Sequence, residues 1–279
     1  MSFLSSGEVN YNSRISRAEM LASRYMFAKQ VLDFYGKIAR FQKDFYEQLP
    51  KLWGKSPRVP ADGRLRGPLN LPILAAPFGK FLAVVESQGP GPLAAEAHRL
   101  AQGAEAAWAE LLEAFWRSGL IEGPEGAAGD PRAEFMARAF LMPYAEFVVS
   151  GMLPPVLPMT VCRCPRCNSL PLLGVLRQEG DGGKRFLQCS FCSQEWEFRR
   201  ILCAHCGEES EGKLPVYIAE QFLHIRVECC ETCKHFLRTI DLTKDGHSVP
   251  LVDDLAAIPL TLWADENGYK RIQTNLLGT

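Results

Sequence analysis

Cysteine is concentrated in one part of this 279-residue chain, and its spacing points to metal binding. All ten cysteines lie between Cys162 and Cys233. Eight of them form four CxxC pairs, which are Cys164/Cys167, Cys189/Cys192, Cys203/Cys206 and Cys230/Cys233. The two-residue gap lets a tight turn point both sulfurs at one ion about 2.3 Å away, so two such knuckles complete a tetrahedron. The sequence therefore predicts two metal ions per chain, each held by four of these eight cysteines.

The four pairs repeat along the chain as a duplicated unit. The first pair recurs 39 positions later as the third, and the second recurs 41 positions later as the fourth. A duplicated ribbon with a two-residue loop insertion explains these intervals. We expect one site from the first two pairs and one from the last two. Interleaved pairing, of the first pair with the third and the second with the fourth, stays open as an alternative.

Cys162 and Cys229 fall outside the CxxC pairs. Cys229 adjoins Cys230, and neighbouring side chains on a strand point to opposite faces, so these two are not expected to bind one ion. Cys162 could replace Cys164 only through a longer loop. We interpret both as free thiols. Three histidines of the region are expected at the surface or on strands and not as ligands: His205, His224 and His235.

Four thiolates in a tetrahedron suit zinc, a single iron ion or an iron–sulfur cluster, and the spacing does not choose among these. A catalytic zinc site keeps one position open, whereas these sites would be filled. The sequence shows no Ser/His/Asp arrangement, phosphate-binding loop or carboxylate pair, and no βαβ setting around a CxxC pair for a thioredoxin-like activity. The residues therefore predict structural or redox centres in a protein that is not an enzyme.

Charge and hydropathy limit the kinds of partner and the cellular compartment that we expect for this protein. The formal net charge is −1, and two divalent ions in four-thiolate sites would bring it to about −5. Residues 162–240 hold eleven Lys or Arg against ten Asp or Glu, so the basic excess that phosphate contacts need is missing and nucleic-acid binding is not expected. The N-terminal residues lack a basic start followed by an apolar run, and Glu146 and four prolines interrupt the apolar stretch 139–158. We therefore expect a cytoplasmic protein with no membrane insertion, whose cysteines bind metal and do not form disulfides.

The first 150 residues contain no cysteine and repeat apolar residues at helical spacing. A capping-box sequence opens an apolar stripe that predicts one helix over residues 16–50. Further helices are expected at 71–85 and at 93–115, the latter closed by the glycine-rich segment 123–129. Asp130-Pro131 supplies an N-cap and a first-turn proline for a fourth helix.

The pattern changes after the proline-rich segment 153–158, which cannot continue a helix. Beyond it, short alternating runs predict a ribbon of three strands around each metal site. The expected strands are 172–177, 184–188 and 195–199 in the first ribbon, and 216–218, 224–227 and 236–240 in the second.

These patterns together predict an α+β chain. A helical N-terminal domain should precede two tandem rubredoxin-like or zinc-ribbon modules of short antiparallel strands. The expected limits are 1–152 for the helical domain, 160–201 for the first ribbon, 202–245 for the second ribbon, and 246–279 for a C-terminal tail. We expect this tail to pack on the ribbons or on the helical domain.

Several segments of the cysteine region and the tail carry a family resemblance. They are Cys164-Pro165-Arg166-Cys167-Asn168-Ser169-Leu170-Pro171, the junction Trp196-x-x-x-Arg200-x-x-Cys203-x-x-Cys206, the end Cys230-x-x-Cys233-x-x-x-Leu237, and the tail Asp253-Asp254-Leu255-Ala256 with Gly268-Tyr269-x-Arg271-x-x-x-Asn275. Together they resemble the formate dehydrogenase accessory protein family FdhE. Two positions depart from that family's pattern: Lys234 stands where a glycine commonly follows the fourth knuckle, and Thr261 stands where an aspartate is usual.

The resemblance implies a cytoplasmic accessory factor, or chaperone, for the maturation of respiratory formate dehydrogenase. It further implies iron in rubredoxin-like sites and binding to the molybdenum-containing catalytic subunit before export, without enzymatic activity of its own. Iron is therefore the favoured metal, and zinc is the alternative. Two other functions remain open on the residues, namely a rubredoxin-like electron-transfer protein and a nucleic-acid-binding zinc-ribbon protein.

Overall fold

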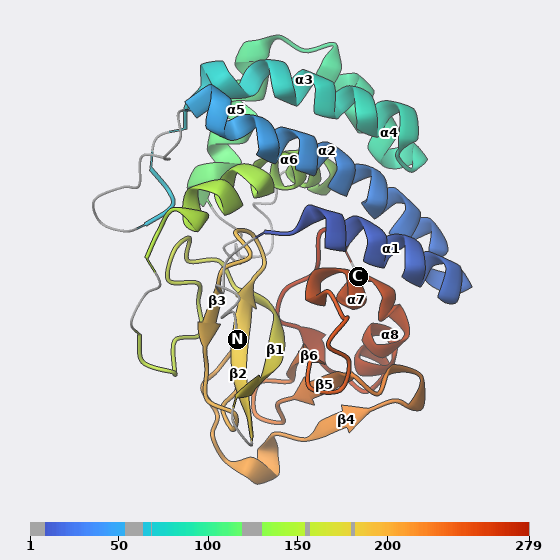
Figure 1. Cartoon of the computed structure of the whole chain (residues 1–279), viewed down its shortest axis with the longest axis vertical. Coiled ribbons are helices and arrows are strands. Elements are labelled where there is room, and N and C mark those ends of the chain that lie inside the picture. The colour runs from blue at the N-terminus through green and yellow to red at the C-terminus, as the bar shows by residue number, and fades with distance from the viewer. Residues whose placement is uncertain are drawn as a thin grey trace.

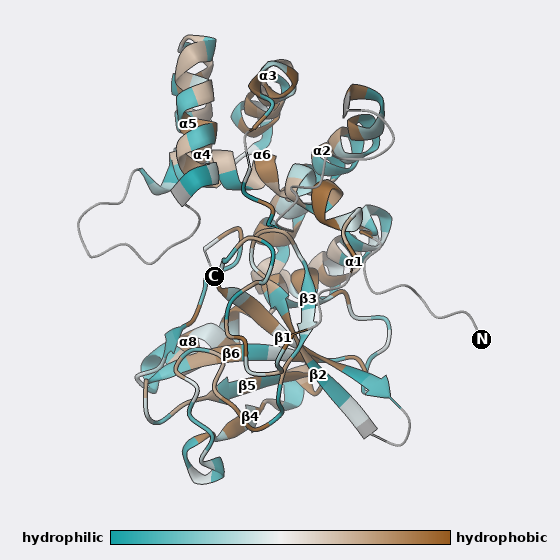
Figure 2. Cartoon of the chain, turned by 90° about the vertical axis from the view of Figure 1, so that its left-hand side faces the viewer, coloured by the Kyte–Doolittle hydropathy of each residue, from teal (hydrophilic) through white to brown (hydrophobic). Residues whose placement is uncertain are grey.

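The computed structural model describes residues 9–53, 64–67, 69–118, 130–153, 157–179 and 182–278. Helices of the N-terminal half lie on one side of the molecule, and the strands of the cysteine-bearing half lie on the other (Figure 1). Figure 2 shows the same division from the side. The predicted α+β class is therefore confirmed. Among the described helices, none is long and apolar enough to cross a membrane.

The helical layer is organised around α6 (Pro131–Ser150). The other elements of this layer are α1 (Tyr11–Arg24), η1 (Met26–Ala28), α2 (Lys29–Trp53), α3 (Leu71–Gln88), α4 (Gly91–Ala101) and α5 (Glu105–Ser118). Side chains of α6 are buried all round from Phe135 to Val149. A helix without a solvent face is a core helix, so the other helices pack around this one.

Two of the four predicted helices are confirmed. The segment 71–85 is α3, which extends to Gln88. α6 starts as the sequence predicts, because the Asp130 carboxylate accepts a hydrogen bond of 2.9 Å from the Arg132 N–H and Pro131 occupies the first turn. The short-range cap and proline signals were sufficient for this helix start.

The predicted single helix over residues 16–50 is wrong, because the structure divides it into α1 and α2. α1 begins earlier than expected, since the Asn10 side chain caps its first turn. The helix ends at Arg24, because the next residue, Tyr25, has a non-helical backbone with φ −116° and ψ 89°. The Tyr25 ring lies 5.2 Å from the ring of Phe222 in the second ribbon. This contact between distant segments accompanies the break, and helical periodicity cannot reveal it.

The predicted helix over residues 93–115 is also wrong as a single element, because α4 and α5 meet at a corner near Gly103. The Gly103 N–H donates to the Leu100 carbonyl at 2.9 Å, and the Trp108 indole N–H donates to the same carbonyl at 2.7 Å. These bonds satisfy a carbonyl at the end of α4, so the chain can change direction there. The segment 123–129, expected to close this helix, lies outside the described residues.

Both ribbons contribute to one sheet. Its strands are β1 (Pro171–Glu179), β2 (Gly182–Cys189), β3 (Glu195–Glu197), β4 (Val216–Ile218), β5 (Ile225–Cys229), β6 (His235–Asp241) and β7 (Lys270–Arg271). Over the described residues the strand order is β3-β2-β1-β6-β5-β4, and β7 pairs with β6. The predicted ribbons correspond to β1-β2-β3 and β4-β5-β6, and their antiparallel pairing confirms them.

The two ribbons join through a pair of parallel strands that the sequence did not predict. β1 runs parallel to β6, with Val175 opposite Ile240. Gly174 lies at this junction, and a Cβ built there would clash with the side chain of Thr239. Since packed interiors leave no room for an extra methyl group, glycine at this position lets the ribbons meet.

The tail returns from the sheet to the helical layer. It forms α7 (Pro250–Ala256) and α8 (Ile258–Glu266) before β7. Val252 and Leu255 of α7 share a buried cluster with Leu21 of α1 and Leu32 of α2. The tail therefore contacts both the helices and the ribbons.

One core cluster crosses the predicted boundary between helices and ribbons. It contains Phe78 and Phe140 from the helical layer together with Cys164, Cys189 and Phe191 from the first ribbon. Within the proline-rich segment, residues 154–156 lie outside the described part of the chain. The four domain limits stay a prediction, but the shared core means that the helical layer and the first ribbon stabilise each other.

Candidate metal centres

All four CxxC pairs fold into the same knuckle. In each, the N–H of the first cysteine donates to the carbonyl five residues later, over 2.8 to 2.9 Å. The residue after the second cysteine has a left-handed backbone in every knuckle: Asn168 (φ 61°), Ser193 (φ 55°), Gly207 (φ 76°) and Lys234 (φ 56°). Backbone N–H groups also point at sulfur, as from Phe191 to Cys189 at 3.3 Å and from His205 to Cys203 at 3.4 Å. Such donors stabilise a thiolate.

The first tetrad, defined as Cys164, Cys167, Cys189 and Cys192, gathers four buried sulfurs from the first ribbon. The sulfurs of Cys164 and Cys192 lie 3.5 Å apart, and that of Cys167 lies 3.3 Å from Cys189 and 3.7 Å from Cys192. A regular tetrahedron with 2.3 Å bonds has edges of about 3.8 Å. The spacing is therefore within a few tenths of an ångström of that of a metal tetrahedron.

The second tetrad, defined as Cys203, Cys206, Cys230 and Cys233, comes from the second ribbon. Its sulfurs lie 3.8 Å apart between Cys203 and Cys233, and 3.7 Å apart between Cys206 and Cys230. Cys206 is exposed and Cys233 is half-buried, unlike any member of the first tetrad. The eight cysteines are thus grouped within each ribbon and not in the interleaved arrangement.

Electrostatics in both tetrads favour a cation at the centre. Burial, reinforced by neighbouring sulfurs, raises the pKa of Cys189 and Cys192 well above the ordinary value. Burial also raises the pKa of Cys203 to about 11 and raises that of Cys233. Burial also acts to raise the pKa of Cys167, but hydrogen bonds from neighbouring thiols hold that pKa well below its ordinary value. Four thiolates need a positive ion to offset their repulsion, so these donors fit a metal.

The donor set limits both the metal and the chemistry. Sulfur-only coordination suits Zn²⁺ or iron and is unsuited to Mg²⁺ or Ca²⁺. When all four positions belong to the protein, none remains for a substrate. A metal site of this kind can stabilise the fold or transfer an electron.

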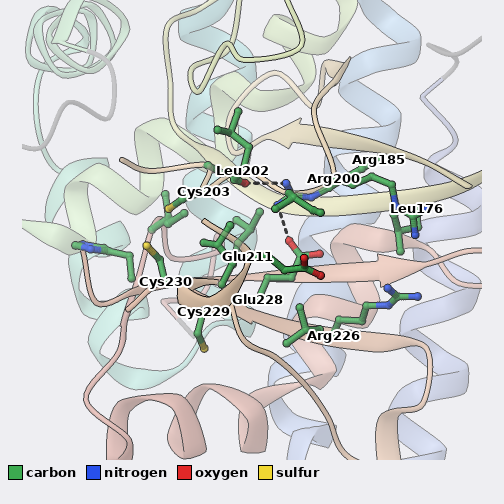
Figure 3. A pocket seen from close by; sticks show the side chains of 17 residues that line it. Leu176, Arg185, Arg200, Leu202, Cys203, Glu211, Arg226, Glu228, Cys229 and Cys230 are labelled. Atoms are coloured by element: carbon green, nitrogen blue, oxygen red, sulfur yellow. Dashed lines mark hydrogen bonds and ion pairs between the residues drawn. The ribbon is translucent and has the colours of Figure 1, made fainter. Parts of the chain in front are cut away.

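Cys162 and Cys229 lie outside both tetrads. Cys229 is buried in the core beneath the second ribbon, and its side chain points away from Glu228 (Figure 3). Cys162 is half-buried, and its sulfur lies 3.8 Å from the Cys203 carbonyl oxygen. Although it precedes the first knuckle in sequence, Cys162 therefore lies beside the second tetrad.

A pocket of about 180 Å³ opens beside the second tetrad and has Cys203 and Cys230 in its lining (Figure 3). Arg185 extends into the pocket, donates to the Leu202 carbonyl at 3.1 Å and pairs with Glu228 at 2.5 Å. Because this arginine has a carboxylate partner, the pocket holds no excess charge from it. The pocket leaves the second tetrad less covered than the first.

Residues of the tail motif form a buried ion network. The sequence showed the motif but not this role. The Asp254 carboxylate lies 2.8 Å from Arg238 and 2.5 Å from Arg271. Asn275 donates to the same carboxylate at 3.0 Å. The network joins α7 to β6 and β7, so the role of these residues is to fix the tail on the second ribbon.

Comparison with known proteins places these features in one family. The model of the FdhE central domain matches residues 163–200, and that of the FdhE C-terminal domain matches residues 187–277. A Protein FdhE homolog from Pseudomonas putida is 27% identical over 96% of this chain and 86% of its own length. The crystal structure of the FdhE protein from Pseudomonas aeruginosa matches with a TM-score of 0.71 and 25% identity, over 96% of this chain and 95% of that chain. The chain belongs to the FdhE family.

Other FdhE relatives match over a shorter length. The Protein FdhE homolog of Aquifex aeolicus is 35% identical over 41% of this chain and 41% of its own length. The homolog of Pseudomonas aeruginosa is 39% identical over 41% of this chain and 38% of its own length. The aligned part thus spans less than half of these two relatives. Likeness to FdhE in the helical layer rests on the match to the Pseudomonas putida homolog and on the solved structure.

The two departures from the FdhE pattern leave the tetrads complete. Lys234 occupies a left-handed position (φ 56°) where glycine would avoid the cost of a Cβ. Thr261 lies on α8, and its hydroxyl oxygen is buried with no hydrogen-bond partner among the described residues. Neither residue supplies or displaces a tetrad sulfur.

Proposed function

We propose that this protein is a non-enzymatic, metal-binding accessory factor for the assembly of respiratory formate dehydrogenase. Each tetrad binds one metal ion, with iron favoured and zinc as the alternative. The ligands are Cys164, Cys167, Cys189 and Cys192 for the first ion, and Cys203, Cys206, Cys230 and Cys233 for the second. The protein acts in the cytoplasm on the catalytic subunit of the dehydrogenase before that subunit is exported.

The observation that carries this proposal is a pair of complete tetrads in a member of the FdhE family. Filled sites offer a substrate no coordination position, so we infer that the function is expressed through another protein. Metal-closed knuckles are rigid, and a rigid surface loses little conformational entropy on association. These properties suit a docking factor better than a catalyst.

Complementation tests the proposed function. A strain that lacks the gene should lose respiratory formate dehydrogenase activity, and the wild-type gene should restore it. Cys164→Ser and Cys203→Ser should each fail to restore activity, whereas the matched variant Cys229→Ser should restore it because Cys229 lies outside both tetrads. Immunoblots must show equal amounts of the variants. Full activity in the deletion strain, with no second factor present, would contradict the proposal.

A binding assay addresses the partner directly. Metal-loaded protein should retain the purified catalytic subunit of formate dehydrogenase in a pull-down, and chelator-treated protein should retain less. Equal retention of an unrelated molybdenum enzyme would contradict specific recognition of that subunit.

Electron transfer is a second candidate because Cys206 of the second tetrad is exposed. An exposed thiolate ligand would bring an iron site close to a redox partner. This candidate requires iron in the second tetrad that cycles reversibly, as followed by its visible spectrum. A site that holds only zinc, which has no redox chemistry, would rule it out.

A further inference from the structure

Two arginines from outside the first ribbon contact the knuckles of the first tetrad. Arg66 lies in the described segment 64–67, and Arg138 lies on the core helix α6. Arg66 Nε donates to the Cys167 carbonyl at 2.8 Å, and Arg138 Nη2 donates to the Ser190 carbonyl at 3.1 Å. Cys167 ends the first knuckle, and Ser190 lies within the second. Each knuckle of the first tetrad is therefore in direct contact with one guanidinium.

Arg66 also acts on a ligand sulfur through a hydroxyl group. Its Nη2 donates to Ser169 Oγ at 3.2 Å, and that oxygen lies 3.3 Å from the Cys167 sulfur. Ser169 is buried. Because the hydroxyl oxygen accepts from the arginine, it can donate its own proton to the sulfur when Cys167 is a thiolate. Hydrogen bonds to the sulfur ligands are one of the factors that set the reduction potential of an iron–sulfur site.

Arg138 is deeply buried and is held by carbonyl oxygens. The residue is 6% exposed. Besides Ser190, its guanidinium donates to the carbonyls of Thr274 at 3.2 Å and Asn275 at 3.3 Å. Carbonyl oxygens carry only partial charge, so these bonds fix the guanidinium in place without neutralising it.

The charge of these two arginines needs compensation. Among the described residues, neither Arg66 nor Arg138 forms an ion pair with a carboxylate. Burial lowers the pKa of Arg138 to about 10, and the charge of Arg271 acts in the same direction. The negative charges that act against this are those of Glu134, one turn away on α6, and of Cys189 in the first tetrad. Four thiolates around a divalent ion leave two negative charges, so a metal-loaded first tetrad matches two arginines.

Two other arginines near the first tetrad have partners of their own. Arg14 pairs with Glu146 at 2.8 Å, and the same carboxylate accepts from Ser193 at 2.5 Å, just after the second knuckle. The charge of Arg14 is therefore already compensated. Arg166 lies within the first knuckle, but its guanidinium donates to the Leu153 carbonyl.

The neighbours of the second tetrad are different. Glu208 follows the third knuckle, and Glu231 lies within the fourth. Lys213 pairs with Glu208 at 3.6 Å, and Lys234 pairs with Glu231. The charges of these four side chains cancel, in contrast to the positive excess at the first tetrad.

We propose that Arg66 and Arg138 are the countercharges of the first metal centre. They hold one carbonyl in each knuckle and offset the two negative charges of a divalent ion bound by four thiolates. Ferric iron in the same ligands would leave only one negative charge, so the arginines favour the ferrous form. Both are positioning residues, because they act through the cysteines and Ser169. The inference rests on the proposed function only in that the first tetrad must bind a metal ion.

Zinc affinity tests the role of charge at Arg66. The parent is reduced full-length Cys230→Ser protein, whose second tetrad lacks a ligand, so that competition with a chelator reports on the first tetrad. Arg66→Gln should weaken Zn²⁺ binding by about 10- to 100-fold, the usual effect of losing a group that supports metal ligands. Arg66→Lys keeps the charge and should retain most of the affinity.

The matched control is Arg177→Gln, which removes an exposed arginine of β1 that already pairs with Glu195. It should bind Zn²⁺ as tightly as the parent. Unchanged affinity in Arg66→Gln would overturn the proposal, as would equal losses in Arg66→Gln and Arg66→Lys. A parent that binds no ion would instead show that metal binding by the first tetrad has failed.

The reduction potential separates a countercharge from mere support of the fold. In iron-loaded protein with both tetrads intact, Arg66→Gln and Arg138→Gln should each lower the midpoint potential of one iron site and leave the other unchanged. Loss of a positive charge disfavours the ferrous form, which fixes the direction of the shift. If buried Arg138→Gln does not fold, half-buried Arg66→Gln decides. A potential that stays constant or rises in Arg66→Gln would overturn the proposal.

Discussion

Arg238 and Asp254 form an ion pair, with 2.8 Å between the arginine Nε and the carboxylate, in which neither side chain has exposed surface. Burial lowers the pKa of Arg238 to about 10. Although burial acts to raise it, the charges of Arg238 and Arg271 lower the pKa of Asp254. The carboxylate therefore stays ionised and compensates two buried arginines that hold the tail on the sheet.

Asp254→Asn should destabilise the protein strongly. Removal of one partner from a buried pair leaves uncompensated charge and costs about 3 to 5 kcal/mol in the free energy of unfolding. Urea titration of the metal-loaded protein would measure the loss. Asp33→Asn is the matched control, because the Asp33 ion pair with Lys29 is half exposed on α2 and such pairs contribute about 0.5 kcal/mol. Similar losses in the two variants would contradict a structural role for the tail network.

Asp245 should make stability depend on pH in the acid range. Although partial burial acts to raise it, hydrogen bonds from Ser248 and Arg17 lower the pKa of Asp245 from 3.8 to about 2. Because the folded pKa lies below the unfolded one, the stabilisation is present above pH 3.8 and is lost as the pH falls towards 2.

A comparison of the wild type with Asp245→Asn isolates this contribution. The wild type should have the higher free energy of unfolding at pH 7, and the difference should shrink below pH 4. Both proteins must be compared in the same metal-free form, so that release of metal in acid does not change the measured free energy of unfolding. A difference that grows as the pH falls would show that the sign is wrong.

The sequence predicted the structural features that depend on residues close together in the chain. It did not predict those that depend on contacts between distant segments. A CxxC knuckle is closed by hydrogen bonds within six residues, so its spacing alone indicates it. The alternation of apolar and polar residues, together with the turn residues, also predicted the hairpins that bring two knuckles together. By contrast, the parallel pairing of β1 with β6 depends on the fit of Gly174 against Thr239, and the break at Tyr25 accompanies a contact with Phe222. Neither relationship leaves a periodic signal in the sequence.

Lys234→Gly should stabilise the fourth knuckle. The left-handed backbone of Lys234 carries a Cβ penalty of about 1 kcal/mol, which glycine avoids. Gly207→Ala, the matched change at the same place in the third knuckle, should destabilise by a similar amount. A Cβ at Gly207 meets no atom within 4 Å, so its effect is conformational and not steric. Urea titration of the Zn²⁺-loaded variants provides the comparison. A loss of stability in Lys234→Gly would mean that the Lys234 ion pair with Glu231 outweighs the backbone strain.

Cys230→Ser should lower the metal content by about one ion per chain, whereas Cys229→Ser should leave it unchanged. The two residues are neighbours, but Cys230 belongs to the second tetrad and Cys229 is buried in the core on the other face of the strand. Metal analysis of the purified variants decides between them. Equal losses would mean that the ligands of the second tetrad are assigned wrongly.

A chelator should remove metal in two phases. The second tetrad should release its ion first because Cys206 is exposed and Cys233 half-buried, while all four cysteines of the first tetrad are buried. The fast phase should be missing in Cys230→Ser, and the slow phase in Cys189→Ser. Release in a single phase from the wild type would contradict the difference in access.

The central claim is that each tetrad holds one metal ion, and the metal content of protein purified without oxygen tests it most directly. The protein is kept reduced throughout, and bound metal and protein concentration are measured on the same sample, with a visible spectrum to identify iron. Two tightly bound ions per chain are expected, because the two sets of four sulfurs each match one metal tetrahedron. A content of one ion, or of none, in fully reduced protein would contradict the account.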